Sequence, residues 1–300
     1  MLDKIMELLK FAYRQKEAVY RVDDVFRSIF ANGFNPKRIL AFFIALIEMI
    51  PGIAEIPQTP LGQELNLDGY QLVFCDDFEG DSLDLNSWQY IPWNARGGLI
   101  NESQVEVRDG NLVITGEYRE DGSEGPGWYC GDIQLKQQYK RGYFEIRCIC
   151  NDGGDFWSAF WIQADHPYDH NISKGGIGGA ELDIFEAMDA DAGPLKRNGI
   201  TQTIHCNGYD DDAENIDSRC LGFFKANNIY KEYNTYGLEW TEDEYIFYVN
   251  GVETCRSSFA AGVSEVAENV RVSLCPPQEF KQSKDYKTQF IVDYVKIWQK

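Results

Sequence analysis

Two alternating runs meet at a two-residue turn in the stretch Gln104-Val-Glu-Val-Arg-Asp-Gly-Asn-Leu-Val-Ile-Thr115. Alternation between apolar and polar side chains is typical of a strand that buries one face. Asp109-Gly110 suits a type I′ turn, because both of its central positions need a positive φ. The stretch therefore predicts a β-hairpin.

The same pattern recurs after Tyr70. Asn250-Gly251 separates two further alternating runs, at residues 244–249 and 252–255. Strands are also predicted at residues 143–150 and 290–298. Many short strands with little helix between them favour an all-β sandwich over a parallel sheet. We expect one β-sandwich domain, which would carry the function, over residues 67–300.

Residues 1–66 differ from this pattern. Apolar residues recur there at helical spacing, at Leu2, Ile5, Leu9 and Ala12. We therefore predict a helical N-terminal extension. Its second apolar run, at residues 39–50, contains Glu48 and is shorter than the roughly 20 residues that a membrane span needs. Residues 37–56 could form a displaced signal-type core, a membrane-associated helix or a helix packed on the main domain, and no ordinary signal peptide precedes them.

Composition narrows the class of partner. The chain has 300 residues, a formal net charge of −20 and 14% aromatic residues. A charge of this sign repels nucleic acid and anionic membrane surfaces, so neither is an expected partner. An uncharged polysaccharide is compatible with it, whereas a sulfated glycan would need a local basic patch. The aromatic residues suit both β-strands and a ring-lined sugar site.

The cysteines do not form a metal-binding pattern. The sequence contains eight of them and no CxxC pair, so a zinc ribbon is not expected. Cys148 and Cys150 alternate along a predicted strand and should point the same way, which is poor geometry for a bond between them. We expect mostly free, buried thiols.

The most informative segment for function is Glu181-Leu-Asp-Ile-Phe-Glu186. Alternation along a strand places Glu181 and Asp183 on one face. Glu186 is five positions from Glu181, which would put it on the opposite face. One bulged residue between Asp183 and Glu186 would restore the phase and align all three acids.

The spacing of the two glutamates then indicates the type of reaction. With one residue absorbed in a bulge, the two glutamate Cα atoms would lie about 13 Å apart. Side chains that reach toward each other would leave roughly 5–6 Å between carboxyls, close to the separation used by retaining glycosidases. Such crowding should also push their pKa values apart, leaving one proton donor and one nucleophile. An acidic strand exposed to solvent, or a cation site, would be the alternatives.

The segment resembles the signature of glycoside hydrolase family 16, which includes laminarinases, lichenases, agarases and carrageenases. Its bulged form is E-x-D-x-x-E. Other segments between residues 70 and 300 also resemble the family, in order along the chain: Leu72-Val-Phe-Cys-Asp-Asp-Phe-Glu-Gly80, Gly142-Tyr-Phe-Glu-Ile-Arg147, Phe156-Trp-Ser-Ala-Phe-Trp161, Tyr236-Gly-Leu-Glu-Trp240, Tyr248-Val-Asn-Gly251 and Val292-Asp-Tyr-Val295. This resemblance implies a jelly-roll β-sandwich of the concanavalin A type.

The resemblance also implies roles for the acids. Glu181 would be the nucleophile, Asp183 the neighbour that tunes its charge, and Glu186 the general acid/base. Trp157 and Trp161 would form the aromatic wall of the subsite before the scissile bond, although either could instead belong to the core.

Three further features follow from the same resemblance. His205 matches a family histidine near the carboxylates, and a purely structural role is an equal alternative. No cofactor is expected for catalysis. A structural calcium would be held by Asp77, the carbonyl of Gly110 and Asp293, because calcium prefers oxygen ligands.

Two segments depart from the family pattern and affect the expected substrate. Trp93-Asn-Ala-Arg-Gly-Gly98 stands where laminarinases usually carry Asn-Asn-Glu-Leu-Gln, and Cys275-Pro-Pro-Gln278 replaces a pattern of glycine and tryptophan. Strict laminarin specificity is therefore in doubt. Trp93 and Trp128 are candidate platform rings at the rim of the site.

The expected function is retaining endo-hydrolysis of a β-linked polysaccharide, with a β-1,3-glucan or mixed-linkage β-glucan as first candidate. A transglycosylase, or a galactanase of the agarase or porphyranase type, is the alternative within the family. A glycan-binding module without catalysis is the alternative from another class. We expect a monomer, secreted or at the cell surface because its substrate is a polymer.

Overall fold

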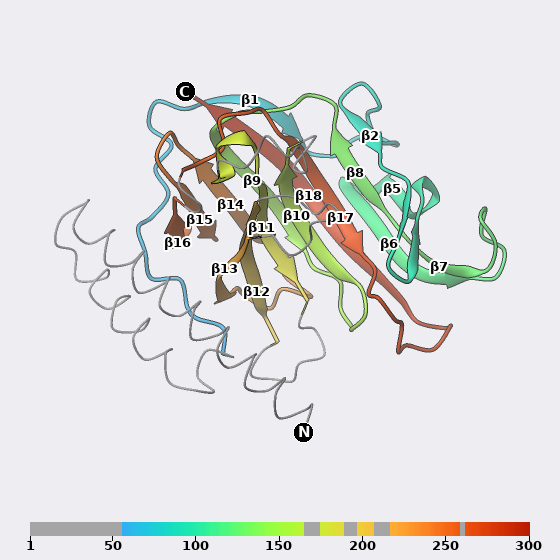
Figure 1. Cartoon of the computed structure of the whole chain (residues 1–300). Helices are drawn as coiled ribbons and strands as arrows, with labels where there is room; N and C mark the ends of the chain where they lie inside the picture. Colours follow the sequence, from blue (N-terminus) through green and yellow to red (C-terminus); the bar gives the residue numbers. More distant parts are fainter. Residues whose placement is uncertain (1–55, 165–174, 189–196, 207–216, 259–261) are drawn as a thin grey trace.

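The computed structural model describes residues 56–164, 175–188, 197–206, 217–258 and 262–300. Within these ranges the chain forms two β-sheets and two short 3-10 helices, η1 (Glu102–Gln104) and η3 (Gly175–Gly178). The sheets lie face to face (Figure 1) and enclose one large apolar core. This arrangement confirms the predicted all-β jelly-roll sandwich.

The larger sheet has eleven strands. Nine of them follow one another in space in the order β16 (Val252–Ser257), β15 (Tyr245–Val249), β14 (Asn234–Trp240), β9 (Gly142–Ile149), β18 (Lys287–Gln299), β6 (Asn111–Arg119), β7 (Gly127–Cys130), β4 (Gly98–Ile100) and β3 (Trp93–Ala95). The other two are β1 (Gln71–Asp76), which pairs with β18, and β5 (Val105–Arg108), which pairs with β6.

The smaller sheet has seven strands. Their spatial order is β13 (Asp217–Lys225), β12 (Gly199–Cys206), β11 (Glu181–Ala187), β10 (Trp157–Gln163), β17 (Asn269–Cys275), β8 (Asp132–Leu135) and β2 (Trp88–Tyr90). The acidic segment therefore forms β11, a central strand with β10 and β12 as its neighbours.

Both predicted hairpins are confirmed. Arg108 pairs with Asn111 across Asp109 and Gly110, whose φ values are 54° and 68°. Val249 pairs with Val252 across Asn250 and Gly251, at 50° and 72°. Positive φ at both central residues gives the turn the twist that a two-residue hairpin needs.

The segment before the sandwich is not helical where it is described. Residues 56–66 contain no helix, so the helical extension predicted for residues 1–66 does not reach beyond residue 55. Gln58 exchanges backbone hydrogen bonds with β13, and Gly62 donates to Glu253 in β16 at 3.0 Å. The segment thus contacts an edge strand of each sheet, which covers backbone groups that would otherwise be exposed. The predicted helices of residues 1–55 lie outside the described residues.

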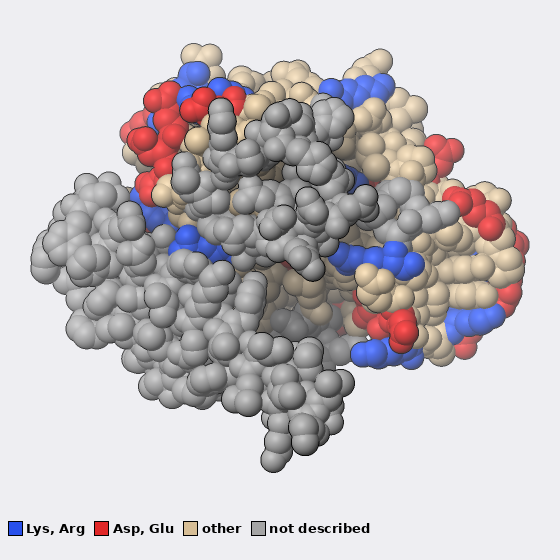
Figure 2. All heavy atoms as spheres, viewed as in Figure 1, with Lys and Arg blue, Asp and Glu red and all other residues tan. Residues whose placement is uncertain are grey.

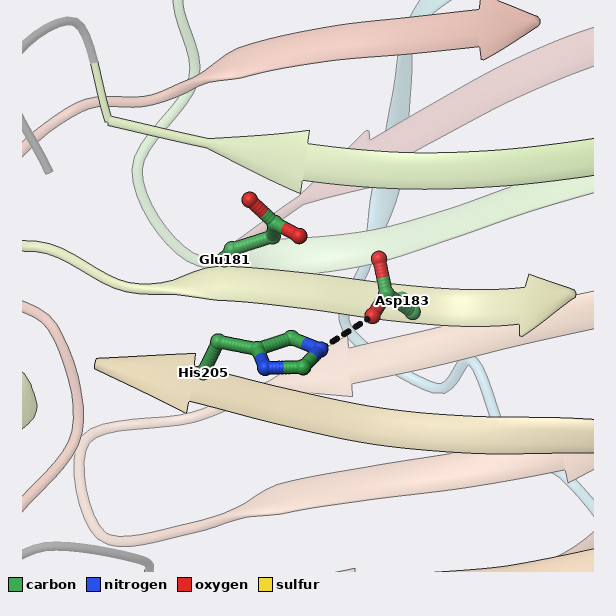
Figure 3. Close-up of side chains that lie close together, drawn as sticks. All are labelled: Glu181, Asp183 and His205. Carbon is green, nitrogen blue, oxygen red and sulfur yellow. Dashed lines mark ion pairs between the residues drawn. The ribbon is translucent and has the colours of Figure 1, made fainter. Parts of the chain in front are cut away.

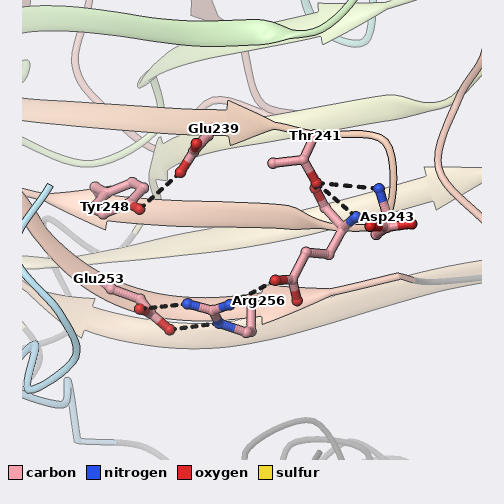
Figure 4. Close-up of polar contacts among 7 residues, drawn as sticks. Glu239, Thr241, Asp243, Tyr248, Glu253 and Arg256 are labelled. Carbon is pink, nitrogen blue, oxygen red and sulfur yellow. Dashed lines mark hydrogen bonds and ion pairs between the residues drawn. The ribbon is translucent and has the colours of Figure 1, made fainter. Parts of the chain in front are cut away.

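A polar cluster on β14, β15 and β16 holds this end of the larger sheet (Figure 4). Arg256 donates two hydrogen bonds of 2.7 Å to Glu253 and one of 2.6 Å to Glu244. Tyr248 donates to Glu239 at 3.2 Å. A bidentate guanidinium–carboxylate pair fixes geometry as well as charge.

The described surface has no dominant charge on the face drawn in Figure 2, where small groups of acidic and basic side chains lie beside one another. Among the described residues, no helix is long and apolar enough to span a membrane. The apolar run of residues 39–50 lies outside them.

Candidate active site

Strand β11 contains the predicted bulge. Toward β10, Asp183 pairs with Trp161 while Phe185 pairs with Phe160, the very next residue to Trp161. The register toward β12 also shifts between Asp183 and Glu186. One residue of β11 is therefore extra, and Glu186 returns to the face of Glu181 and Asp183.

The core explains why the bulge forms here. Ile184 and Phe185 are consecutive, yet both are fully buried between the sheets. The Phe185 ring stacks on Tyr236 of the opposite sheet at 4.2 Å between centroids and meets Phe290 edge-on at 6.1 Å. Burying two successive apolar side chains is incompatible with strict alternation, so their packing stabilises the bulge that turns Glu186 outward.

Each of the three acids has a different partner on the outer face of the smaller sheet. Gln163 in β10 donates to Glu181 at 2.7 Å, and the Trp157 indole donates to Glu186 at 3.1 Å. His205 in β12 lies with Nε2 3.1 Å from Asp183 Oδ2 (Figure 3). Asp183 is the most enclosed of the three, with 4% of the residue exposed.

Burial controls the charge of two of these acids. It raises the pKa of Asp183 to about 7, against the opposing effect of the Arg96 charge. It also raises the pKa of Glu186 to about 8, helped by the negative charge of Asp183. His205, the Trp157 hydrogen bond and Arg96 all lower the pKa of Glu186. Glu186 is therefore protonated at neutral pH and can donate a proton.

Trp157 and Trp161 lie on the same face as the carboxylates, not in the core. Both are half-buried, and they alternate along β10 with the fully buried Phe160 and Ile162. Trp161 pairs with Asp183 across the strands. Their rings are close enough to the acids to contact a sugar that is bound there, as expected of an aromatic wall.

A guanidinium lies on one face of each ring. The Arg96 Cζ atom is 4.4 Å from the centroid of Trp157, and the Arg271 Cζ atom is 4.0 Å from that of Trp161. Such cation–π contacts orient the charge and the ring relative to each other. Each tryptophan therefore keeps only its other face and its edges for a ligand.

Sequence reasoning missed Arg96. It lies in the tight turn between β3 and β4, where Ala95 pairs with Gly98, and has φ of 57°. Gly97 donates its N–H to Pro277 at 2.9 Å, which fixes the turn against the segment 275–278. The two departures from the family pattern thus contact each other. The departure of these two segments from the family pattern indicated that this end of the site differs, but it did not reveal that an arginine would contact Trp157.

Two candidate platform residues have different outcomes. The side chain of Trp93 lies outside the described part of the chain, so its role stays a prediction. Trp128 belongs to an aromatic cluster: Phe280 stacks on it at 4.4 Å between centroids and 9° between planes, and Phe156 meets it edge-on at 6.0 Å. At least one face of Trp128 is therefore occupied by the protein itself.

The proposed calcium ligands gain no support. The Asp293 carboxylate accepts a hydrogen bond of 2.5 Å from Arg147, so a cation already balances it. Asp77 is exposed, and Gly110 lies in the β5–β6 turn. Calcium takes six to eight oxygen ligands, and here one of the two carboxylates is already paired with an arginine while the other is exposed. Calcium at this place remains a prediction.

One group of described side chains could share a metal ion. The ligand atoms of Glu181, Asp183 and His205 all lie within 4.8 Å of one another. His205 already contacts Asp183, and hydrolysis by paired carboxylates needs no metal. The arrangement is therefore explained without an ion.

Several cysteines are buried thiols, as predicted. Cys130, Cys148 and Cys150 are buried and free, Cys275 is half-buried and free, and burial of its thiol raises the pKa of Cys275 to about 12. Cys148 in β9 and Cys150, the first residue after that strand, both belong to the core. The raised pKa keeps the Cys275 thiol protonated at neutral pH, which makes it a poor nucleophile.

Comparison with known proteins adds a family to this geometry. The family model "Beta-porphyranase A-D, GH16 domain" matches residues 71–300. The chain is 26% identical over 181 residues to a β-glucanase of Acetivibrio thermocellus, which covers 59% of the chain and 47% of that protein. It is 24% identical over 206 residues to glucan endo-1,3-β-glucosidase A1 of Niallia circulans, which covers 61% of the chain and 29% of that protein. The chain thus spans less than half of either relative.

Solved structures agree on the fold. SCLam, a non-specific endo-β-1,3(4)-glucanase of family GH16, matches with a TM-score of 0.66 and 20% identity. The match covers 82% of this chain and 97% of that one. A laminarinase catalytic domain from Thermotoga petrophila matches with a TM-score of 0.61, 16% identity and coverage of 77% and 98%.

Proposed function

The chain belongs to glycoside hydrolase family 16, in the group of β-porphyranase GH16 domains, and from this premise we propose that it is a retaining endo-β-glycosidase. The observation that supports the proposal is the bulge in β11, which brings Glu181, Asp183 and Glu186 onto one face. A binding module would have no use for a proton donor beside a second carboxylate.

The reaction would proceed in two displacements. Glu181 attacks the anomeric carbon while Glu186 gives its proton to the leaving glycosidic oxygen, which releases the reducing-end product. Glu186, now charged, then takes a proton from water. The resulting hydroxide displaces Glu181 from the anomeric carbon, which restores both acids and keeps the anomeric configuration.

Asp183 and His205 would adjust the charge of this pair. Asp183 lies between the two glutamates in sequence and contacts His205 at 3.1 Å. Its raised pKa allows it to share a proton with its neighbours as Glu186 changes charge. Trp157 and Trp161 would contact the apolar face of the sugar next to the cleaved bond.

The first candidate substrate is a β-1,3-glucan or mixed-linkage β-glucan. The names of the two relatives support it, one being a β-glucanase and the other a glucan endo-1,3-β-glucosidase. A neutral polymer also fits a chain with a formal charge of −20.

The second candidate is a sulfated galactan of the porphyran type. The description of the matching family supports it, and so does the position of Arg96. This side chain is exposed, carries a positive charge and lies beside Trp157, whose indole binds Glu186. A guanidinium next to the cleavage site could receive a sulfate group. A transglycosylase of either specificity would use the same covalent intermediate.

We propose further that the enzyme works outside the cell or at its surface, since a polymer cannot reach an enzyme inside. No cofactor is proposed for the reaction. Secretion into a culture medium, followed by immunodetection, would test the location.

A reducing-sugar assay on laminarin, lichenan, agarose, porphyran and carrageenan would test the proposed function. We expect turnover on one class, lost by at least about a thousandfold in Glu181→Ala and in Glu186→Ala. Arg96→Met should lower activity on porphyran but not on desulfated porphyran if a sulfate is recognised. Glycan binding without carboxylate-dependent turnover on any member would instead indicate a binding module.

The length of the products separates hydrolysis from transfer. A hydrolase yields only shorter chains, whereas a transglycosylase also yields chains longer than the starting oligosaccharide. Glu186→Ala should recover activity on substrates with a good leaving group, because these need no proton at the first step. A uniform loss on all leaving groups would contradict the acid role of Glu186.

A further inference from the structure

A line of polar contacts connects Glu181 to a buried ion pair three strands away. Gln163 in β10 donates from Nε2 to Glu181 at 2.7 Å and accepts at Oε1 from Arg271 Nη1 at 3.3 Å. Arg271 in β17 also donates to Asp132 in β8 through Nη2 and Nε. The contacts therefore cross the strands β11, β10, β17 and β8, which are neighbours in the smaller sheet.

Arg271 determines which end of the Gln163 amide faces Glu181. An amide has one accepting oxygen and one donating nitrogen, whereas a guanidinium can only donate. Arg271 must therefore contact the amide oxygen, which leaves the NH₂ group for Glu181. Without Arg271 the amide could rotate and present its oxygen to a carboxylate, which is repulsive.

Arg271 is held firmly enough to do this. The side chain of Asp132 is only 1% exposed, and that of Arg271 only 10%. The Arg271 Cζ atom lies over the Trp161 ring, 4.0 Å from its centroid, and the Trp161 indole donates to Ser273 at 3.0 Å. A buried ion pair and a stacked ring together leave the guanidinium little freedom.

We propose that Gln163 and Arg271 are positioning residues for the nucleophile, an inference that rests on the proposed function. Gln163 holds Glu181 and presents N–H to its charge, and Arg271 acts through Gln163 by fixing the direction of the amide. Because Arg271 also contacts Trp161, the aromatic wall and the nucleophile share one support.

Kinetics of the whole protein test the first part. Gln163→Leu should lower kcat by up to about a hundredfold and change KM by less than about twofold, because a displaced nucleophile affects the reaction more than binding. A good leaving group should not restore activity, in contrast to Glu186→Ala. Gln289→Leu, a matched substitution on β18 in the other sheet, should leave kcat and KM unchanged.

A double-mutant cycle tests the second part. Arg271→Met alone would leave Asp132 charged and buried, so the variant to use is Asp132→Asn with Arg271→Met. This pair of substitutions should lower kcat as Gln163→Leu does, and should add no further loss in the Gln163→Leu background. Losses that multiply would show that Arg271 acts independently of Gln163 and would overturn the inference.

A measurement without substrate separates this inference from the proposed function. In ¹⁵N-labelled protein, the Gln163 side-chain amide, assigned by its loss in Gln163→Leu, should shift when Glu181 is changed to glutamine. It should also shift in Asp132→Asn/Arg271→Met. An amide signal that is indifferent to both changes would overturn the inference even if the enzyme is active. A responsive amide in a protein without turnover would refute only the enzymatic function.

Discussion

Glu186 is subject to opposing influences, and its pKa reports their balance. Burial and the charge of Asp183 raise this pKa, whereas His205, the Trp157 hydrogen bond and Arg96 lower it. The acid must be protonated for the first displacement. Activity should therefore be present below about pH 8 and decline as the pH rises through that value.

Two substitutions should move this alkaline limb in opposite directions. Arg96→Met removes a positive charge and should shift the limb of kcat/KM to higher pH. Asp183→Asn removes a negative charge and should shift the limb of the residual activity to lower pH. Arg108→Met, in the remote β5–β6 hairpin, should shift neither. Limbs that move the same way in both variants would contradict this assignment of charges.

At the scale of the element, the bulge in β11 determines whether the three acids meet. Deleting Ile184 would leave Glu181-Leu-Asp-Phe-Glu, in which simple alternation already places all three acids on one face. We expect carboxylate-dependent turnover to survive the deletion, because Glu186 stays on the face of Glu181.

Circular dichroism and thermal unfolding would accompany these assays, because only folded variants are informative. A folded but inactive deletion variant would contradict this account of how the three acids share a face.

The sequence allowed some elements to be predicted and not others, for local reasons. The two hairpins could be predicted because each turn is specified by two adjacent residues. The bulge could be predicted because alternation along the six residues 181–186 would otherwise place Glu186 on the wrong face. The contacts of Arg96 with Trp157 and of Arg271 with Gln163 depend on how strands distant in sequence are aligned, and local sequence patterns do not encode this alignment. The helical extension predicted for residues 1–66 does not reach residues 56–66, because their backbone pairs with an edge strand of each sheet.

For the molecule as a whole, buried carboxyls make stability depend on pH. Burial raises the pKa of Glu268 to about 8, and this fully enclosed side chain accepts the Ala180 N–H at 2.9 Å. Burial raises the pKa values of Asp183 and Glu186 too. Between pH 4.5 and the folded pKa, the folded state holds a proton that the unfolded state has lost. As the pH rises through that window, each such group therefore lowers the free energy of unfolding by about 1.4 kcal/mol per pH unit.

Thermal unfolding should accordingly occur at lower temperature as the pH rises from 5 toward 8. Glu268→Gln keeps an acceptor for Ala180 but cannot ionise, so it should flatten this dependence without greatly changing stability near pH 5. Glu64→Gln, an exposed carboxyl outside the core, is the matched control and should leave the slope unchanged. A slope that is identical in wild type and Glu268→Gln would exclude Glu268 as a contributor.

The central claim is that Glu181 and Glu186 act from one face of the sheet as nucleophile and acid. The most direct test is proton NMR of the first product formed from the polysaccharide that the enzyme cleaves. The spectrum reports the anomeric configuration of this product before mutarotation. The account predicts that the β-anomer appears first, with the signal absent in Glu181→Ala. An α-anomer formed first would mean direct attack by water and would contradict it.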